Sequence, residues 1–173
     1  MFRTLLSIAA LAACLSACAT TALPASAPGL TPAQQSAPEA SIRLAESPCY
    51  FTCASYEIEV KPNGDYTLTN LKNTRKDGVS KGSFGADVWG KAMAAFDAAN
   101  FATLPTDLTP SAAIRPSNVP CINDLPAATF TRRIAEGDEK QVVYNTGCAV
   151  PEARQLLDTL RTLFQWSTLV KPG

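Results

Sequence analysis

A close pair of cysteines followed by an alternating segment constrains the fold of this chain more than any other part of its sequence. Cys49 and Cys53 are separated by three residues, and apolar side chains then recur at every second position, at Tyr56, Ile58 and Val60. Such alternation is typical of a strand with one buried face. We therefore expect a disulfide-pinned loop that leads directly into a β-hairpin.

The length of the turn in this hairpin decides whether its apolar side chains all lie on one face of the sheet. A two-residue turn would pair Lys61 with Tyr66 and would divide the apolar side chains between both faces of the sheet. A three-residue turn over 62–64 instead pairs Val60 with Tyr66 and keeps the apolar side chains on one face. Such a turn needs a residue with positive φ near its end, and Gly64 supplies it.

The first 17 residues have the pattern of a bacterial export signal. A short segment with Arg3 precedes an apolar run from Leu5 to Ala13, and small residues follow. The apolar run is too short to span a membrane as a helix. We therefore predict a signal peptide over residues 1–17 and an exported mature chain.

The residues around Cys18 favour lipid attachment. The tetrapeptide Leu-Ser-Ala-Cys at 15–18 resembles the lipobox, at which signal peptidase II cuts before an acylated cysteine. A similar tetrapeptide ends at Cys14, but cleavage before Cys18 leaves four further cysteines, an even number that can pair. We predict acylation at Cys18; acylation at Cys14 and an ordinary secretory cut after Ala27 are the alternatives. By resemblance to Gram-negative lipoproteins, Ala19 indicates sorting to the outer membrane, with a soluble periplasmic protein as the alternative.

Composition divides the mature chain into a tether and a folded domain. Residues 18–40 consist almost entirely of Ala, Pro, Thr, Ser, Gln and Leu with one charged residue, which is typical of flexible coil. Residues 41–170 are long enough for a single domain with its own core. Removal of Arg3 with the signal peptide leaves 14 of the 15 basic residues against 15 acidic ones. A net charge this close to zero argues against nucleic-acid binding.

Two helices and a second hairpin are predicted beyond the first hairpin. Apolar residues at helical spacing predict helices over 88–99 and from 151 to about 166. Segments 128–135 and 140–146 form the second hairpin, and a short strand over 41–45 precedes the cysteine loop. Strands and helices do not alternate in this order. We therefore expect an α+β fold, with an antiparallel sheet built from two β-hairpins and a short N-terminal strand, and two helices packed on one face.

Four cysteines remain for the folded domain, and export favours disulfides over free thiols. Three pairings are open. We prefer Cys49 with Cys53 and Cys121 with Cys148, because the second hairpin carries Cys148 back beside the segment that holds Cys121. Cys49 and Cys53 are also the only candidates for thiol-disulfide exchange or copper(I) binding, which is the alternative function.

A basic cluster lies between the first hairpin and the first helix. It comprises Lys72, Arg75, Lys76 and Lys81. A solvated loop is the ordinary interpretation of such a cluster, and an anion-binding surface is the alternative.

The chain contains no histidine, which excludes Ser-His-Asp triads and zinc sites with histidine ligands. We predict no catalytic residue, no cofactor and no metal. The remaining role is non-enzymatic: the lipid anchor holds the domain at the membrane, where it binds or scaffolds a periplasmic protein or another envelope ligand. Tyr50 and Phe51, on the tight cysteine loop, are the natural contact residues. Packing of both rings against the edge of the core is the alternative.

Several stretches resemble the bacterial domain-of-unknown-function family 6438, whose members show a P-C-F-G-T-C-P-x-Y motif, a D-G turn and a helix ending A-x-F-F-x-L-P. The matching stretches here are IRL at 42–44, PCYFTC at 48–53 followed by Tyr56, NGDY at 63–66 and AFDAANFATLP at 95–105. This chain departs from the motif in having Phe51 for the usual Gly and Ala54 for Pro. The resemblance covers most of residues 41–166. It implies secreted or lipid-anchored placement and brings no established activity.

Overall fold

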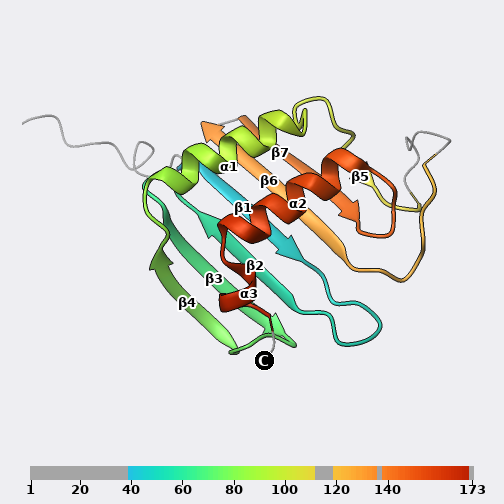
Figure 1. Cartoon of the computed structure of the whole chain (residues 1–173), viewed down its shortest axis with the longest axis horizontal. Helices are drawn as coiled ribbons and strands as arrows, with labels where there is room; N and C mark the ends of the chain where they lie inside the picture. Colours follow the sequence, from blue (N-terminus) through green and yellow to red (C-terminus); the bar gives the residue numbers. More distant parts are fainter. Residues whose placement is uncertain (1–38, 112–118, 136–137, 172–173) are drawn as a thin grey trace, which may run out of the picture. The chain divides into compact units, whose positions relative to one another are not determined.

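The computed structural model of the chain describes residues 39–111, 119–135 and 138–171. The predicted signal peptide, Cys14, Cys18 and all but the last two residues of the predicted tether lie outside the described residues. The described part contains a seven-stranded sheet, two long helices and one short helix (Figure 1).

One sheet connects all seven strands. The strands are β1 (Ser41–Glu46), β2 (Ser55–Val60), β3 (Asp65–Lys72), β4 (Gly78–Ser83), β5 (Asp107–Leu108), β6 (Ala127–Ala135) and β7 (Asp138–Asn145). The helices are α1 (Asp87–Ala98), α2 (Pro151–Leu163) and α3 (Trp166–Leu169). The strand order is β4-β3-β2-β1-β6-β7-β5, and every neighbouring pair is antiparallel except β5 with β7. The predicted α+β class is confirmed.

The sheet and the helical layer are larger than the predicted layout of two hairpins, one strand and two helices. β5 has only two residues, so it carries no alternating pattern that the sequence could reveal. The last helical stretch does not continue to Trp166, because Gln165 adopts a left-handed conformation with φ of 51°. The chain therefore ends α2 at Leu163 and begins the separate helix α3.

The first hairpin has the register that the apolar pattern predicts. Val60 pairs with Tyr66, and Ile58 pairs with Leu68. Gly64 has φ of 85° in the turn, and its N–H donates to the carbonyl of Lys61 at 2.9 Å. A Cβ atom at this position would lie 2.2 Å from the carbonyl oxygen of Gly85, so the turn requires glycine for its space as well as for its φ.

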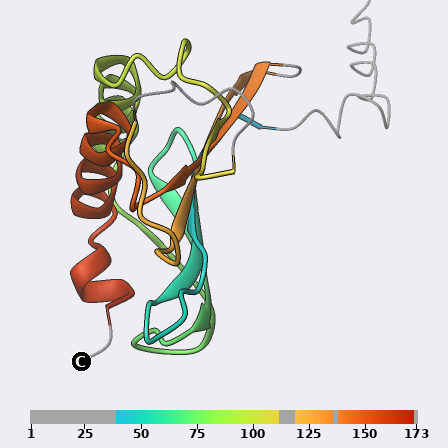
Figure 2. The ribbon, with the colours of Figure 1, turned by 90° about the vertical axis from the view of Figure 1, so that its right-hand side faces the viewer.

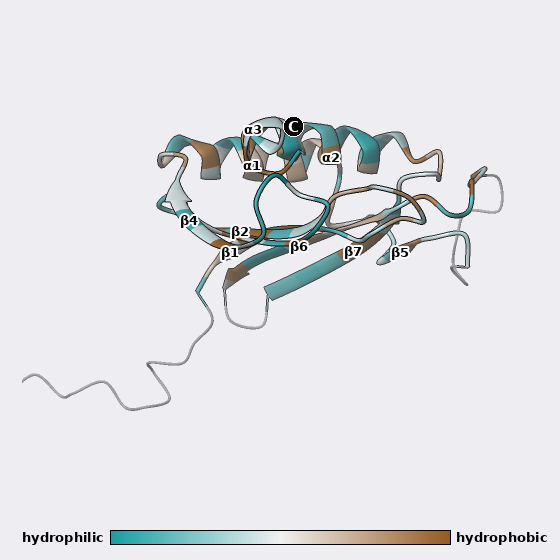
Figure 3. Ribbon diagram, turned by 90° about the horizontal axis from the view of Figure 1, so that it is seen from below, coloured by the Kyte–Doolittle hydropathy of each residue, from teal (hydrophilic) through white to brown (hydrophobic). Residues whose placement is uncertain are grey.

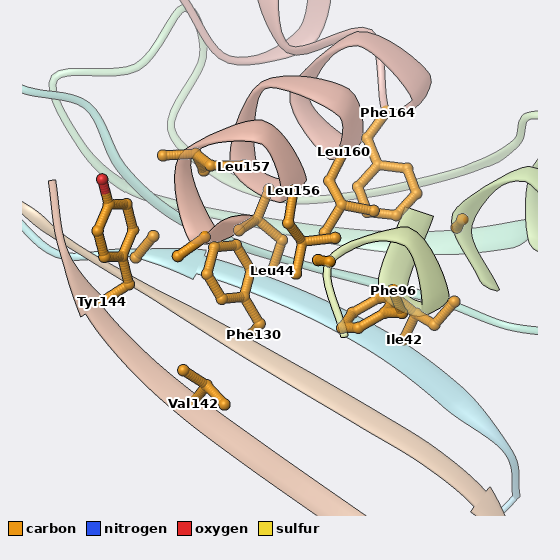
Figure 4. Packing of buried hydrophobic residues seen from close by; sticks show 14 of the residues in the cluster. Ile42, Leu44, Phe96, Phe130, Val142, Tyr144, Leu156, Leu157, Leu160 and Phe164 are labelled. Carbon is orange, nitrogen blue, oxygen red and sulfur yellow. The ribbon is translucent and has the colours of Figure 1, made fainter. Parts of the chain in front are cut away.

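The core lies between the sheet and the long helices. α1 and α2 lie side by side on one face of the sheet (Figures 2 and 3). Ile42 and Leu44 alternate toward this face, and both are completely buried. Figure 4 shows Leu156 and Leu160 of α2 above the strands, close to the side chains from β1 and β6. Burial of these side chains supplies the main driving force for folding.

The opposite face of the sheet is polar. Arg43 lies 3.4 Å from Glu57 and 3.7 Å from Glu59 on the neighbouring strand. Arg133 and Glu139 form a similar cross-strand pair at 2.6 Å. No helix of the described segments covers this face (Figure 3), which agrees with its charged composition.

Candidate functional site

Residues 47–54 connect β1 to β2 and contain the predicted disulfide between Cys49 and Cys53. The Cα atoms of the two cysteines are 5.4 Å apart, within the usual range for a bridge. The backbone N–H of Cys53 also donates to Sγ of Cys49 at 3.3 Å. The bridge therefore holds a five-residue loop that extends beyond the end of the strands (Figure 1).

The two predicted contact residues are the most exposed large apolar side chains in the described part of the chain. Tyr50 is 86% exposed and Phe51 is 79% exposed. Their rings contact each other edge to face, with centroids 5.4 Å apart. This exposure excludes the alternative in which both rings pack against the edge of the core.

A buried polar network lies at the base of this loop. Glu46, the last residue of β1, pairs across the ladder with Tyr56 of β2. The hydroxyl of Tyr56 donates to Oε1 of Glu46 at 2.5 Å. Arg161 of α2 donates to the same oxygen from Nε at 2.8 Å and to Oε2 from Nη2. We call these three residues the clamp, because they tie both ends of the cysteine loop to α2.

Burial keeps the hydroxyl of Tyr56 protonated. Desolvation raises the pKa of Tyr56 above its ordinary value, and the charge of Glu46 raises this pKa further. The phenol therefore stays protonated and keeps its O–H as a donor to the carboxylate. Arg161 also lies over the ring of Trp166, with its guanidinium carbon 5.1 Å from the ring centroid.

The clamp was not predicted from the sequence, although the position of Glu46 in its strand gives an indication of it. Glu46 occurs in phase with Ile42 and Leu44, so the alternation of β1 points it toward the core. A charged residue in that phase indicates a buried partner. Only the tertiary fold shows that the partner is Arg161, which is 115 residues away.

The second predicted disulfide, between Cys121 and Cys148, is also present. Backbone hydrogen bonds flank it: the N–H of Ile122 donates to the carbonyl of Gly147, and the N–H of Ala149 donates to that of Pro120, both at 2.9 Å. The bridge and these bonds hold the chain before β6 against the segment that follows β7.

Both disulfides lie at one end of the sheet, which we call the loop end. It comprises segments 47–54, 73–77, 119–126 and 146–150, which flank the strand ends at that side. Asn73 Nδ2 donates to the carbonyl of Cys53 at 3.3 Å, and the N–H of Ser47 donates to that of Ala127 at 2.9 Å. The four segments are therefore joined both by neighbouring strands and by direct bonds.

Exposed apolar side chains gather at the loop end. Seven large apolar residues are exposed in the described part of the chain, and four of them lie in these segments. The four are Tyr50, Phe51, Ile122 and Leu125. Scattered apolar residues are normal on a surface, whereas a concentration of them indicates an interaction site.

The basic cluster is divided by the fold. Lys72, Arg75 and Lys76 lie at the loop end, and none of them forms an ion pair within the described segments. The N–H of Arg75 donates to the carbonyl of Val170 at 2.8 Å, which brings the C-terminal segment to the same place. Lys81 lies farther along β4.

Within the described ranges, no three His, Cys, Asp or Glu side chains gather in a group that could hold a metal ion. None of the helices there has the length and apolar character needed to cross a membrane.

Residues 40–164 match the profile of a family described as a domain of unknown function, DUF6438. The match covers all seven strands and both long helices. It agrees with the resemblance carried by the cysteine loop, the turn and the first helix. No curated protein is significantly similar to the chain.

Proposed function

This chain belongs to the DUF6438 family. We propose that it is a non-enzymatic cell-envelope lipoprotein and that its folded domain binds a periplasmic partner. The signal pattern and the lipobox at Cys18 support export and anchoring, with the outer membrane as the proposed location. Two disulfides support an oxidising compartment. Several acyl chains together would hold the protein firmly on the membrane.

The observation that carries the proposal is the exposed pair Tyr50 and Phe51 on a covalently closed loop. Aromatic residues held in fixed positions are frequent hot spots of protein interfaces. Rigidity lowers the entropy that a contact surface loses on binding. The disulfide closes the loop, and the clamp fixes the strand residues on either side of it. The two rings are therefore held in a preorganised position.

The cysteine loop lies at the opposite end of β1 from the start of the folded domain. β1 begins at Ser41, directly after the predicted tether, and ends at the loop end. Six residues of strand span about 20 Å. The loop end therefore lies about one strand length from the residue at which the folded domain begins.

Crosslinking in intact cells tests the proposed contact. We expect a partner that is captured by the native chain and lost from the variant carrying Tyr50→Ser and Phe51→Ser. The matched control carries Val79→Ser and Ile134→Ser, which remove two exposed apolar residues from other parts of the sheet. Equal capture by the loop variant and the native chain would contradict the proposed contact surface.

Mass spectrometry of the mature N-terminus tests the anchor. We expect an acylated N-terminal peptide that begins at Cys18. A mature chain that begins after Ala27, or an intact chain that still begins at Met1, would contradict lipid anchoring. Neither result depends on the partner.

A thiol-disulfide or copper(I)-binding protein that uses Cys49 and Cys53 is the second candidate. One contact favours it: the N–H of Cys53 points at Sγ of Cys49, and the same bond would stabilise a thiolate after reduction. Equilibration with glutathione separates the candidates, because structural disulfides have potentials below about −300 mV and catalytic ones lie higher. We expect the structural value.

A further inference from the structure

Strand β4 forms an open edge of the sheet. It pairs with β3 on one side, and no described segment pairs with its other side (Figure 1). The strand at the opposite edge, β5, has only two residues. β4 has six residues, contains no proline and shows no register shift along its ladder with β3. It therefore lacks the short length, the prolines and the bulges that prevent many edge strands from pairing with another chain.

Backbone hydrogen bonds determine which groups of β4 face outward. The N–H of Phe84 donates to the carbonyl of Gly64 at 3.0 Å, in phase with the ladder of β3 and β4. Hydrogen-bonded pairs recur at every second residue of an antiparallel ladder. The even-numbered residues of β4 therefore bond to β3. The N–H and C=O groups of Val79 and Lys81 point away from the sheet and are open to a further strand.

The two faces of this edge differ in character. Lys81 pairs with Thr67, so its side chain lies on the polar face of the sheet. On the core side, a Cβ atom at Gly82 would lie 2.8 Å from Cε1 of Tyr66. The Tyr66 ring therefore covers β4 at Gly82. A strand added to this edge would meet a polar face on one side and an aromatic ring on the other.

The charge of Lys81 determines which chain can pair with this edge. Its side chain forms no ion pair within the described segments. In a two-fold antiparallel pairing with a second copy through Val79, Lys81 and Ser83, each Lys81 would lie opposite the same residue of the other copy. Like charges directly opposite each other destabilise a strand pair, whereas opposite charges stabilise it. The edge therefore disfavours a second copy and favours a strand with an acidic residue at this position.

We propose that β4 binds an extended segment of a partner polypeptide as an additional antiparallel strand. Main-chain hydrogen bonds to Val79 and Lys81 supply affinity. An acidic residue of the segment lies opposite Lys81 on the polar face, and its two neighbours are apolar and lie on the core side, beside the Tyr66 ring. This site is independent of the proposed partner surface, since it requires neither the lipid anchor nor Tyr50 and Phe51.

The acetylated and amidated peptide Thr-Val-Glu-Val-Thr has this pattern and tests the site by nuclear magnetic resonance. The isotope-labelled chain over residues 19–173 retains every described residue. Without the peptide, we expect rapid hydrogen exchange at the amides of Val79 and Lys81 and slow exchange at that of Ser80, which bonds to β3. The peptide should produce saturable shifts at Val79 and Lys81 and should slow the exchange of the Lys81 amide.

Two N-methylated peptides test the direction of the backbone bonds. A methyl group on the glutamate nitrogen removes the donor that faces the carbonyl of Lys81, and it should weaken binding by at least about tenfold. A methyl group on the nitrogen of the second valine points away from β4 and leaves these bonds intact. We expect this matched control to bind much more tightly than the first methylated peptide.

Variants assign the peptide to the edge and test the charge. Lys81→Glu should weaken binding of the glutamate peptide by about fivefold and should favour the peptide with lysine in place of glutamate. Lys81→Pro removes an N–H that faces solvent, so it should change the urea midpoint little but should prevent binding of both peptides.

Four results would overturn the proposal. They are the absence of saturable shifts at Val79 and Lys81, equal effects of the two methyl groups, binding of the peptide by the folded Lys81→Pro variant, and an unchanged preference for the glutamate peptide in Lys81→Glu. Slow exchange of the Lys81 amide without the peptide would indicate pairing with a second copy, and it would also overturn the proposed occupant.

Discussion

Glu46 is a charged residue that lies among core side chains, with 5% of its surface exposed. A buried carboxylate is stable only when it is paired and hydrogen-bonded. Tyr56 and Arg161 supply these bonds from β2 and α2. At the scale of single residues, the clamp therefore determines how firmly the cysteine loop is held against the helical layer.

Loss of Arg161 should destabilise the fold strongly. Arg161→Met keeps most of the side-chain volume but leaves Glu46 buried without its cation, so we expect the free energy of unfolding to fall by about 3–5 kcal/mol. Urea denaturation measures this change. Lys91→Met is the control, because the pair of Lys91 with Asp87 is exposed and such pairs contribute little. Equal effects of the two substitutions would contradict a buried clamp.

Tyr56 should make the fold sensitive to alkaline pH. Its pKa is raised in the folded state, while the unfolded phenol loses its proton near the ordinary value of 10.0. The contribution of Tyr56 is therefore complete below pH 10.0 and is lost as the pH rises further, at about 1.4 kcal/mol per pH unit. Denaturation curves between about pH 9 and pH 11 should show a smaller decline for Tyr56→Phe than for the native chain. Identical slopes would contradict this assignment.

The disulfides and the exposed aromatic pair could be predicted at this scale, but the clamp could not. Tyr50 and Phe51 are adjacent to the cysteines that restrain them, so their loop is visible in the sequence. Arg161 acquires its role from Glu46, which only tertiary packing brings near. An inward Glu in a strand indicates a buried partner without identifying that partner.

At the scale of elements, the turn between β2 and β3 is held by a close backbone contact. Gly64 lies against the backbone of Gly85, and the N–H of Phe84 donates to the carbonyl of Gly64 at 3.0 Å. The first hairpin is thereby joined to the segment that enters α1. A side chain at position 64 would disturb two elements at once.

Comparison of two glycine substitutions isolates this contact. Gly64→Ala introduces both an unfavourable φ and a steric overlap, whereas Gly78→Ala has a similar φ of 92° and open space around its Cβ. We expect Gly78→Ala to cost about 1 kcal/mol and Gly64→Ala clearly more, up to about 3 kcal/mol. Thermal and urea denaturation measure both values. A larger loss for Gly78→Ala would contradict the backbone contact.

The two disulfides should contribute unequally to stability. Loop-closure entropy predicts losses of about 2 kcal/mol when Cys49 and Cys53 are both replaced by Ala and about 3.5 kcal/mol for Cys121 and Cys148. Urea denaturation of the two double variants tests this order. The reverse order would show that the cysteine loop supports the fold more than its size suggests.

Elements with a clear period could be predicted from the sequence, and those without one could not. The hairpin of β2 and β3 has alternating residues and a glycine turn, so both its register and the φ of Gly64 follow from the pattern. β5 is two residues long and pairs through tertiary contact with β7. The break at Gln165 separates α2 from α3, and no Gly or Pro at this position indicates it in the sequence.

At the scale of the whole described structure, the sheet has two different ends. Strand β1 begins at one end, and the loop end lies at the other, with both disulfides and most of the exposed apolar residues. The sequence does not reveal this concentration, because segments near residues 50, 73 and 122 are far apart along the chain. The sheet order brings them together.

Site-specific photocrosslinking in intact cells tests the partner surface most directly. A photoreactive amino acid is placed at Phe51 in one chain and at Ile134 in another, because Ile134 is an exposed apolar residue outside the loop end. We expect a discrete adduct from position 51 that disappears when Cys49 and Cys53 are replaced by Ala, and none from position 134. The absence of an adduct at position 51, or the same adduct from both positions, would contradict a partner surface on the cysteine loop.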